Sequence, residues 1–177
     1  MKISLIGSPG AGKSTFARQL AAATDLPLMS LDTLWHRLDY SAQARQQFIQ
    51  QQQDFIDIHA SWVIDGNYYD TIETRFQHSD IVVWFQISRP HAIWRVVRRS
   101  MRFRRDRQTR PEMPPQFHEQ FDRDYLEFMR FVWHYPTKER RRLQPVLQRL
   151  KMTNKLIIVR DQVSRDAVLA ALTHNLN

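Results

Sequence analysis

The distribution of glycine constrains this chain more than any other feature of its sequence. Only four of the 177 residues are glycine, and three of these, Gly7, Gly10 and Gly12, lie close together near the N-terminus. Glycine adopts positive φ angles without steric cost and lets the backbone approach a ligand closely. A chain that concentrates its glycine in this way is expected to form one specialised loop.

The segment from residue 7 to residue 15 reads Gly-Ser-Pro-Gly-Ala-Gly-Lys-Ser-Thr and satisfies the pattern G-x-x-x-x-G-K-[ST]. A strand is predicted before it, over residues 2–6, and a helix after it, over residues 13–23. In such a loop, backbone N–H groups turn toward phosphate oxygens and the helix N-terminus adds positive partial charge. The pattern therefore predicts a nucleotide-binding loop made of Gly7, Ser8, Pro9, Gly10, Ala11, Gly12, Lys13, Ser14 and Thr15.

Two side chains of this loop have expected roles of their own. Lys13 is expected to reach the β- and γ-phosphates, and the hydroxyl of Ser14 to ligate Mg²⁺. The alternative is a glycine-rich turn that binds nothing. A chance match to several fixed positions in the correct strand–helix context is the weaker explanation.

The rest of the chain alternates strands with helices. Further strands are predicted over residues 28–31, 61–65, 80–87 and 155–160, and further helices over 41–59, after Pro90, and over about 116–134, 137–150 and 164–173, with a loop at 106–115. This alternation is typical of an α/β fold with a parallel sheet and helices on both faces. No linker or internal repeat divides the chain, so we expect one domain over residues 1–177.

Composition narrows the class of protein. Cysteine is absent, which excludes disulfides and thiolate sites. The sequence contains no run of about 18 apolar residues, so no membrane span is predicted. The apolar N-terminal stretch is too short for a signal peptide, and a cytoplasmic location is therefore expected. The formal net charge of +8 favours an anionic partner such as a nucleotide, a phosphorylated substrate or a nucleic acid.

Two aspartates compete for the role of metal ligand. Ligands of parallel α/β sheets bind at the carboxyl ends of the strands. Asp65 ends the predicted strand at 61–65, whereas Asp80 begins the strand at 80–87 and is expected at the opposite edge. We therefore predict that Asp65, together with Ser14, serves Mg²⁺. The alternative for Asp65 is a turn-forming Asp-Gly pair.

Asp32 follows the short second strand, also at a carboxyl end. It is a candidate to bind a substrate hydroxyl or to act as its general base. The other interpretation, that Asp32 is the N-cap of the segment 33–35, is equally compatible with the sequence.

Eight arginines lie between residues 95 and 110. Arg95, Arg99 and Arg102 share a helical face, and the proline-rich segment that follows predicts an arginine-bearing lid over about 103–118. Closing such a lid would bring arginines to the charge on a transferred phosphoryl group. The alternatives are a solvated basic helix or a nucleic-acid patch, which the basic cluster at 138–142 would extend.

These features together resemble the adenylate-kinase and shikimate-kinase group of P-loop NTPases, and most closely the bacterial DNA topology modulation proteins, which are adenylate-kinase-like. The matching segments are GSPGAGKST at 7–15, LDTLWH at 31–36, WVIDGNY at 62–68, Arg75 ahead of DIVVWF at 80–85, WRVVRR at 94–99, TRPEM at 109–113 and FVWHYPTKERRRL at 131–143. They extend over almost the whole chain.

The resemblance implies a three-layer fold whose five-stranded parallel sheet has the order 2-3-1-4-5, with a lid, and it implies ATP and Mg²⁺ as ligands. It also implies that Arg95, Arg99 and Arg110 contact phosphates and that Arg160 lies near the adenine. The chain departs from adenylate kinases, because Asn67-Tyr68-Tyr69 follows the Asp-Gly pair in place of a proline and an arginine. It also lacks the glycine triplet of shikimate kinases, so the resemblance does not supply the acceptor.

We therefore expect a kinase that transfers the γ-phosphate of ATP to a small, nucleotide-like acceptor bound by residues of about 30–60, acting as a monomer or a homodimer. Lys13, Arg95, Arg99 and Arg110 would stabilise the transferred group, and Asp32 is the candidate base. The alternative is a nucleotide-dependent regulator or ATPase that binds nucleic acid.

Overall fold

The computed structural model describes residues 1–109 and 121–175. The strands are β1 (Lys2–Gly7), β2 (Leu28–Ser30), β3 (Trp62–Asp65), β4 (Ile81–Phe85) and β5 (Leu156–Val159). The helices are α1 (Lys13–Thr24), α2 (Leu31–His36), α3 (Ala42–Ile58), α4 (Ile72–His78), α5 (Arg89–Arg105), α6 (Arg123–Arg149) and α7 (Gln162–His174). Short 3-10 turns occupy Tyr69–Thr71, Arg107–Thr109 and Met152–Lys155.

The five strands form one sheet in the order β2-β3-β1-β4-β5, and every neighbouring pair is parallel. This confirms the predicted fold and strand order. The register pairs Gly7 with Phe85 and Ser30 with Asp65. The ends of four strands therefore meet along one edge of the sheet, and the segments that leave these ends lie close together.

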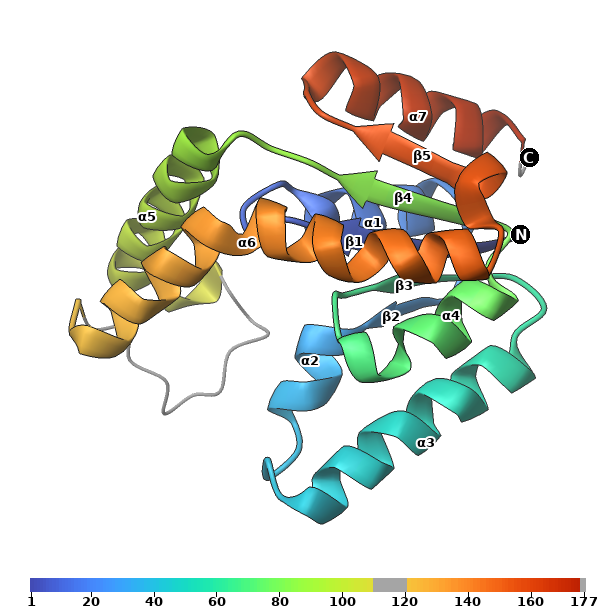
Figure 1. The fold of residues 1–177 in the computed structure, drawn as a ribbon, viewed down its shortest axis with the longest axis horizontal. Helices are drawn as coiled ribbons and strands as arrows, with labels where there is room; N and C mark the ends of the chain where they lie inside the picture. Colours follow the sequence, from blue (N-terminus) through green and yellow to red (C-terminus); the bar gives the residue numbers. More distant parts are fainter. Residues whose placement is uncertain (110–120, 176–177) are drawn as a thin grey trace.

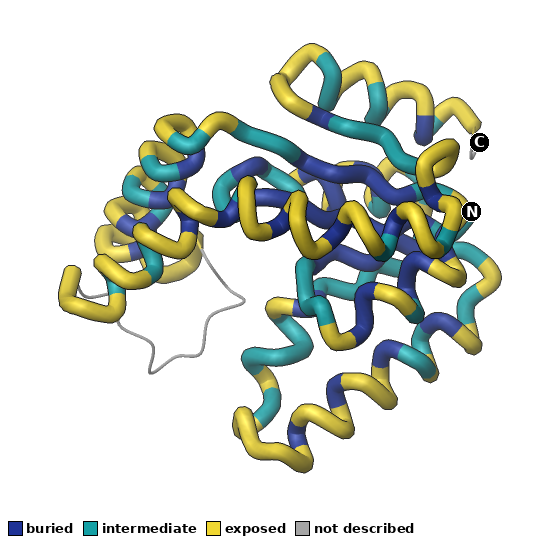
Figure 2. The backbone as a smooth tube through the Cα atoms, in the orientation of Figure 1, coloured by how far each residue is buried: buried dark blue, intermediate teal, exposed yellow. Residues whose placement is uncertain are grey.

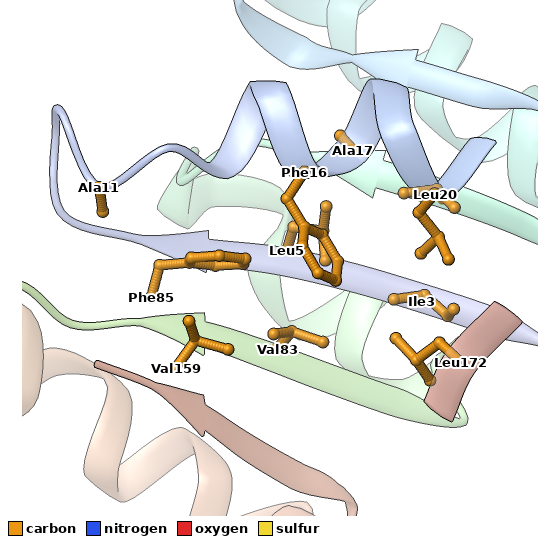
Figure 3. Packing of buried hydrophobic residues seen from close by; sticks show 11 residues of the cluster. Ile3, Leu5, Ala11, Phe16, Ala17, Leu20, Val83, Phe85, Val159 and Leu172 are labelled. Atoms are coloured by element: carbon orange, nitrogen blue, oxygen red, sulfur yellow. The ribbon is translucent and has the colours of Figure 1, made fainter. Parts of the chain in front are cut away.

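Helices cover both faces of the sheet, which makes three layers (Figure 1). On one face, α1 and α7 place Phe16, Leu20 and Leu172 against strand residues such as Ile3 and Val83 (Figure 3). On the other face, α4 and the C-terminal half of α6 bury an apolar set that includes Phe76, Leu143, Leu147, Ile6 and Trp84. The buried residues concentrate along the strands, with exposed residues on the outer sides of the helices (Figure 2).

Two further clusters shape the edge where the strands end. The helix α3 packs Phe48 and Ile56 against Trp62 and Ile64, and so supports α2 beside β3. The helix α5 packs against the N-terminal half of α6 through Ala92, Val96 and Val132. These two helical segments, which we call the α5–α6 arm, extend beyond the carboxyl edge of the sheet (Figure 1).

The helix α6 corrects one prediction. Two helices were expected, over 116–134 and 137–150, but the described part is a single helix of 27 residues that contains Pro136 and Pro145. Proline removes a helical hydrogen bond and usually ends or kinks a helix. Here one buried stripe continues across both prolines, and its members are Val132, Tyr135, Glu139, Leu143 and Leu147. Packing of this stripe outweighs the cost of the prolines, and residues 116–120 lie outside the described residues.

Two other differences concern the ends and number of elements. The strand expected over 80–87 is shorter, Ile81–Phe85, and the helix α4 was not predicted. Among the described residues, no helix has both the length and the apolar character needed to cross a membrane.

Candidate active site

A cleft of about 1010 Å³ opens at the carboxyl edge of the sheet. Its walls come from the phosphate loop, from α2 and the segment after β3, and from the α5–α6 arm. The predicted loop, the candidate base and the arginine-rich helix therefore share one cavity, although up to about a hundred positions separate them in the sequence.

The glycines of the loop occupy backbone conformations that other residues rarely adopt. Gly7, Gly10 and Gly12 have φ angles of 136°, 77° and 91°. A Cβ atom on Gly7 would lie 2.0 Å from the carbonyl oxygen of Phe85, so the loop begins in direct backbone contact with β4. Gly12 has open space around it, and what it supplies is the left-handed turn into α1.

The N-terminus of α1 is prepared for an anion. Its N-cap is Gly12, which has no side chain to cap the helix, and the first turn carries no acidic residue. The first N–H groups of a helix have no partner within the helix, and the helix dipole gives them positive partial charge. A phosphate group held by the loop would satisfy these groups.

Lys13 lies within the loop. Its Nζ donates hydrogen bonds to the carbonyl oxygens of Gly7, at 2.8 Å, and of Ser8, at 3.2 Å. The ammonium group therefore already points into the loop, on the side where the phosphates of a nucleotide would lie.

Asp65 is buried beside the loop, with 4% of its surface exposed. Its Oδ1 atom has no hydrogen-bond partner, and its interactions include a hydrogen bond with Ser14 and the charges of Lys13 and Arg18. Burial, the largest effect, raises the pKa of Asp65 above its usual value, and the charge of Asp32 adds to this, while Lys13, Ser14 and Arg18 lower it. A buried carboxylate oxygen without a partner next to a hydroxyl fits the predicted Mg²⁺ ligands.

A Mg²⁺ ion at Ser14 and Asp65 would depend on the nucleotide for most of its ligands. Residues 1–109 and 121–175 contain no group of three or more His, Asp or Glu side chains arranged to hold a metal. Mg²⁺ in phosphate sites takes one or two protein ligands, with phosphate oxygens and waters completing its shell. Asp80 lies at the opposite edge of the sheet, where its carboxylate accepts a 2.7 Å hydrogen bond from the backbone N–H of Lys2.

Asp32 lies in the first turn of α2 and lines the cleft. The N-cap of this helix is Ser30, so the interpretation of Asp32 as an N-cap for 33–35 is wrong. Tyr68 approaches Asp32 from the segment after β3. Burial, followed by the charge of Asp32 and a hydrogen bond with it, raises the pKa of the Tyr68 hydroxyl above its usual value. The exposed carboxylate of Asp32 thus has one neutral hydroxyl beside it and faces the cleft.

The helix α5 contributes four arginines to the opposite wall, Arg95, Arg98, Arg99 and Arg102. Arg95 Nη1 lies 3.5 Å from the carbonyl oxygen of Gly10, and the guanidinium of Arg98 lies 5.2 Å from the ring centre of Trp94. Arg110 and residues 110–118 of the predicted lid lie outside the described residues. Residues 103–109 form the end of α5 and a 3-10 turn, of which Thr109 lines the cleft.

Arg160 follows β5 and does not line the main cleft. It lines a second cavity of about 400 Å³, which borders the phosphate loop through Ser8 and also contains Gln86 and Glu139. The adenine contact that the family resemblance implies for Arg160 stays a prediction.

Two buried charged residues near the site were missed as functional candidates. The Arg75 guanidinium is completely buried, and burial lowers its pKa to about 10, although Asp65 opposes this. Glu139 has 2% of its surface exposed, accepts hydrogen bonds from Trp84 Nε1 at 3.2 Å and from the Tyr135 hydroxyl, and interacts with the charge of Lys13. Burial raises the pKa of Glu139 to about 7. A charged residue within an apolar helical stripe was the signal that could have identified Glu139.

Compared as a sequence, the chain matches no protein-family model and no curated protein. Compared as a structure, it is similar to a proposed kinase from Chloroflexus aurantiacus J-10-fl, with a TM-score of 0.60 and 17% identity over 99% of this chain and 98% of that one. It is also similar to shikimate kinase from Acinetobacter baumannii, solved in complex with shikimate, with a TM-score of 0.58 and 16% identity over 99% and 92% of the two chains. The described part of the chain therefore has the P-loop kinase fold.

Proposed function

We propose that this protein is an Mg²⁺-dependent kinase that transfers the γ-phosphate of ATP to a small-molecule acceptor. The observation that carries the proposal is that the phosphate loop, the carboxylate of Asp32 and the arginines of α5 line one cleft. A phosphate cradle alone would suit any nucleotide-binding protein. A base candidate on the facing wall of the same cleft favours transfer to a second substrate. The fold similarity to two kinases supports the same class of reaction.

The chemistry can be assigned to residues of this chain. The Asp32 carboxylate would accept the proton of an acceptor hydroxyl as its oxygen forms a bond to the γ-phosphorus and the bond from that phosphorus to the β-phosphate oxygen breaks. Lys13, Arg95 and Arg99 would stabilise the charge that spreads over the transferred group. Arg110 keeps its predicted role in the same stabilisation.

Ser14 and Asp65 are the residues proposed to hold Mg²⁺. When bound, the ion neutralises charge on the β- and γ-phosphate oxygens. The protein would contribute the Ser14 hydroxyl and one buried carboxylate oxygen of Asp65 to the binding of this ion.

The charge of the cleft favours an anionic acceptor. Six cationic side chains line it, and they are Lys13, Arg18, Arg95, Arg98, Arg99 and Arg102. Asp32 is the acid among the lining residues, and Asp65 is buried beside them. These side chains together carry more positive charge than ATP with Mg²⁺ carries negative charge, and a volume of about 1010 Å³ has room for a second ligand. A nucleotide-like acceptor, bound near Asp32, Trp35 and Tyr68, meets both conditions.

A second candidate is a nucleotide-dependent regulator that binds nucleic acid through the α5–α6 arm. Two exposed tryptophans of this arm, Trp94 and Trp133, have the guanidinium groups of Arg98 and Arg89 at 5.2 and 5.7 Å from their ring centres. Exposed aromatic rings beside arginines suit stacking on the bases of single strands. This candidate predicts an affinity that falls steeply with salt, and no binding at low salt would exclude it.

The experiment that tests the kinase is ATP turnover by the purified protein with Mg²⁺, with and without a panel of nucleoside monophosphates and small alcohols. Stimulation by one compound would establish transfer and identify the acceptor. Lys13→Ala should abolish the stimulated rate. Lys155→Ala should leave it unchanged, because Lys155 is exposed and its Nζ donates to the Ser79 carbonyl near the far edge of the sheet. Full activity of Lys13→Ala would refute the assignment.

A further inference from the structure

The side chain of Asn67 extends the pairing of β1 beyond the end of β3. β3 ends at Asp65, and the amide of Asn67 takes the place of a strand partner for Gly7, the last residue of β1. The Gly7 N–H donates to Asn67 Oδ1 at 2.9 Å, and Asn67 Nδ2 donates to the Gly7 carbonyl oxygen at 3.0 Å. Only one orientation of the amide makes both bonds, so the positions of its nitrogen and its oxygen are fixed.

The backbone on either side of Asn67 is restrained as well. Arg75 is completely buried, and its Nη1 and Nη2 donate to the carbonyls of Gly66 and Tyr68, each at 2.8 Å. The N–H of Gly66 in turn donates to the carbonyl of Leu5 at 3.1 Å. The amide of Asn67 therefore has little freedom to turn away from Gly7, and a donor held in this way loses little entropy when it binds a ligand.

The amide nitrogen of Asn67 has one donor to spare. It carries two N–H groups, and Gly7 accepts from one of them. Among residues 1–109 and 121–175, the second N–H has no acceptor. The Gly7 carbonyl follows the Gly7 N–H along β1, so Nδ2 is the end of the amide nearer the carboxyl edge of the sheet. The second N–H lies on the side of Nδ2 away from Oδ1 and therefore points toward this edge, where Asn67 lines the main cleft.

This N–H lies beside the ammonium group of Lys13. Lys13 Nζ and Asn67 Nδ2 donate to the same Gly7 oxygen, at 2.8 and 3.0 Å. Because an ammonium group has three N–H donors, Lys13 can keep its bond to Gly7 while it binds a phosphate. The next residue after Asn67, Tyr68, lies beside the candidate base Asp32. Asn67 is thus between the phosphate loop and the site proposed for the acceptor, where the transferred phosphoryl group would lie.

We propose that Asn67 is a catalytic residue whose second amide N–H donates a hydrogen bond to the γ-phosphate of ATP. The proposal rests on the proposed binding of ATP by the phosphate loop. It gives a task to a position where the chain departs from adenylate kinases. Since ADP has no γ-phosphate, this contact distinguishes ATP from ADP, whereas general support of the loop by Asn67 would affect both nucleotides alike.

Calorimetric titration in the presence of Mg²⁺ tests the proposal. The two ligands are ADP and the β,γ-methylene analogue of ATP, which cannot transfer its terminal phosphate. Asn67→Ala removes the bonds to Gly7, so it costs some affinity for both. It should weaken binding of the ATP analogue about tenfold more than binding of ADP, because a hydrogen bond to a charged group is lost in addition. Asn154→Ala, at an exposed position in the turn before β5, is the matched control and should bind both ligands normally.

Asn67→Asp is a second test of the same contact. Aspartate has the shape of asparagine and can still accept from the Gly7 N–H, but its carboxylate offers no N–H and repels the γ-phosphate. The loss for the ATP analogue should therefore exceed the loss for ADP by more than it does in Asn67→Ala. The midpoint of thermal unfolding is recorded for every variant, and should Asn67→Ala fail to fold, the comparison is read from Asn67→Asp.

Each outcome has a separate meaning. Equal losses for the two nucleotides would overturn the γ-phosphate contact and leave the kinase proposal standing. A selective loss for the ATP analogue, in a protein whose ATP turnover no acceptor stimulates, would support the contact and contradict the kinase. If the unsubstituted protein binds neither nucleotide, both proposals are overturned.

Discussion

Ser30 lies opposite Asp65 in the register of β2 and β3. Ser30 is also the N-cap of α2, so the helix that carries Asp32 begins directly beside the buried carboxylate. Because the two carboxylates are close, the negative charge of Asp32 helps to raise the pKa of Asp65. Two carboxylates thus lie on one side of the cleft in different surroundings, one exposed and one buried, and the proposed function gives them different tasks.

For the exposed member of this pair, we expect Asp32→Asn to lower kcat for the acceptor-dependent reaction by about a hundredfold or more, because the amide cannot accept the proton of the acceptor hydroxyl. The KM for ATP should change little. Steady-state kinetics with the identified acceptor would check this. Asp57→Asn, on the exposed side of α3, is the control and should behave as the unsubstituted protein. A kcat within twofold of normal for Asp32→Asn would remove Asp32 as the base.

For the buried member, Asp65→Asn should raise the concentration of Mg²⁺ needed for half-maximal activity by about tenfold, because a neutral amide is a poorer ligand for a hard cation. Titrating activity with Mg²⁺ at fixed ATP measures the change. Asp80→Asn is a well-matched comparison, since Asp80 lies at the opposite edge of the sheet, where its carboxylate accepts a hydrogen bond from the N–H of Lys2. Identical Mg²⁺ curves for the two variants would count against Asp65 as a metal ligand.

The buried carboxyl of Glu139 should make stability depend on pH. Burial raises its pKa from the usual 4.5 to about 7 in the folded protein, so between these pH values the folded state keeps a proton that the unfolded state has lost. The contribution of Glu139 to the free energy of unfolding should therefore be fully present below about pH 4.5, fall as pH rises to 7 and level off above it. The total decrease should be about 3 kcal/mol.

Glu139→Gln removes this titration and should show a flatter profile. Urea unfolding of both proteins at pH 5 and pH 8 is the measurement, and the variant should gain stability relative to the unsubstituted protein as pH rises. Parallel profiles for the two proteins would show that Glu139 does not titrate in this range.

Arg75→Ala should destabilise the protein by about 3 kcal/mol or more, because it leaves the carbonyls of Gly66 and Tyr68 without their charged donors and opens a cavity. Arg149→Ala removes an arginine whose ion pair with Glu73 is exposed, and it should cost at most about 1 kcal/mol. Chemical denaturation of both variants gives the comparison. Equal losses of unfolding free energy in the two variants would show that the buried hydrogen bonds of Arg75 stabilise the protein no more than an exposed ion pair does.

The sequence predicted the features that depend on local patterns. The phosphate loop follows from a dense glycine motif, and the central strands from continuous apolar runs that suit burial on both faces. The same reasoning placed Asp65 and Asp80 at opposite edges of the sheet, because all the strands run in parallel.

The features that escaped prediction depend on contacts between distant segments. The continuity of α6 through Pro136 and Pro145 results from packing of its buried stripe against α5 and the sheet, which local rules for proline do not include. Likewise, Arg75 and Asn67 look like ordinary polar residues in the sequence. Their positions next to Gly66 and Gly7 arise only when β1, β3 and α4 come together.

The position of β1 in the sheet has a consequence for the order of assembly. β1 lies between β3 and β4, and both partners follow it in the chain, so β1 leaves the ribosome before either can pair with it. The hydrogen bond from the Gly7 N–H to the side chain of Asn67 cannot form until residue 67 has emerged, and that from the Ser8 N–H to the carbonyl of Phe85 has to wait for residue 85. During synthesis the phosphate loop therefore lacks its contact with β4 until late, and a translational pause before β4 would leave β1 paired with β3 alone and expose its other, apolar edge to chaperones or to aggregation.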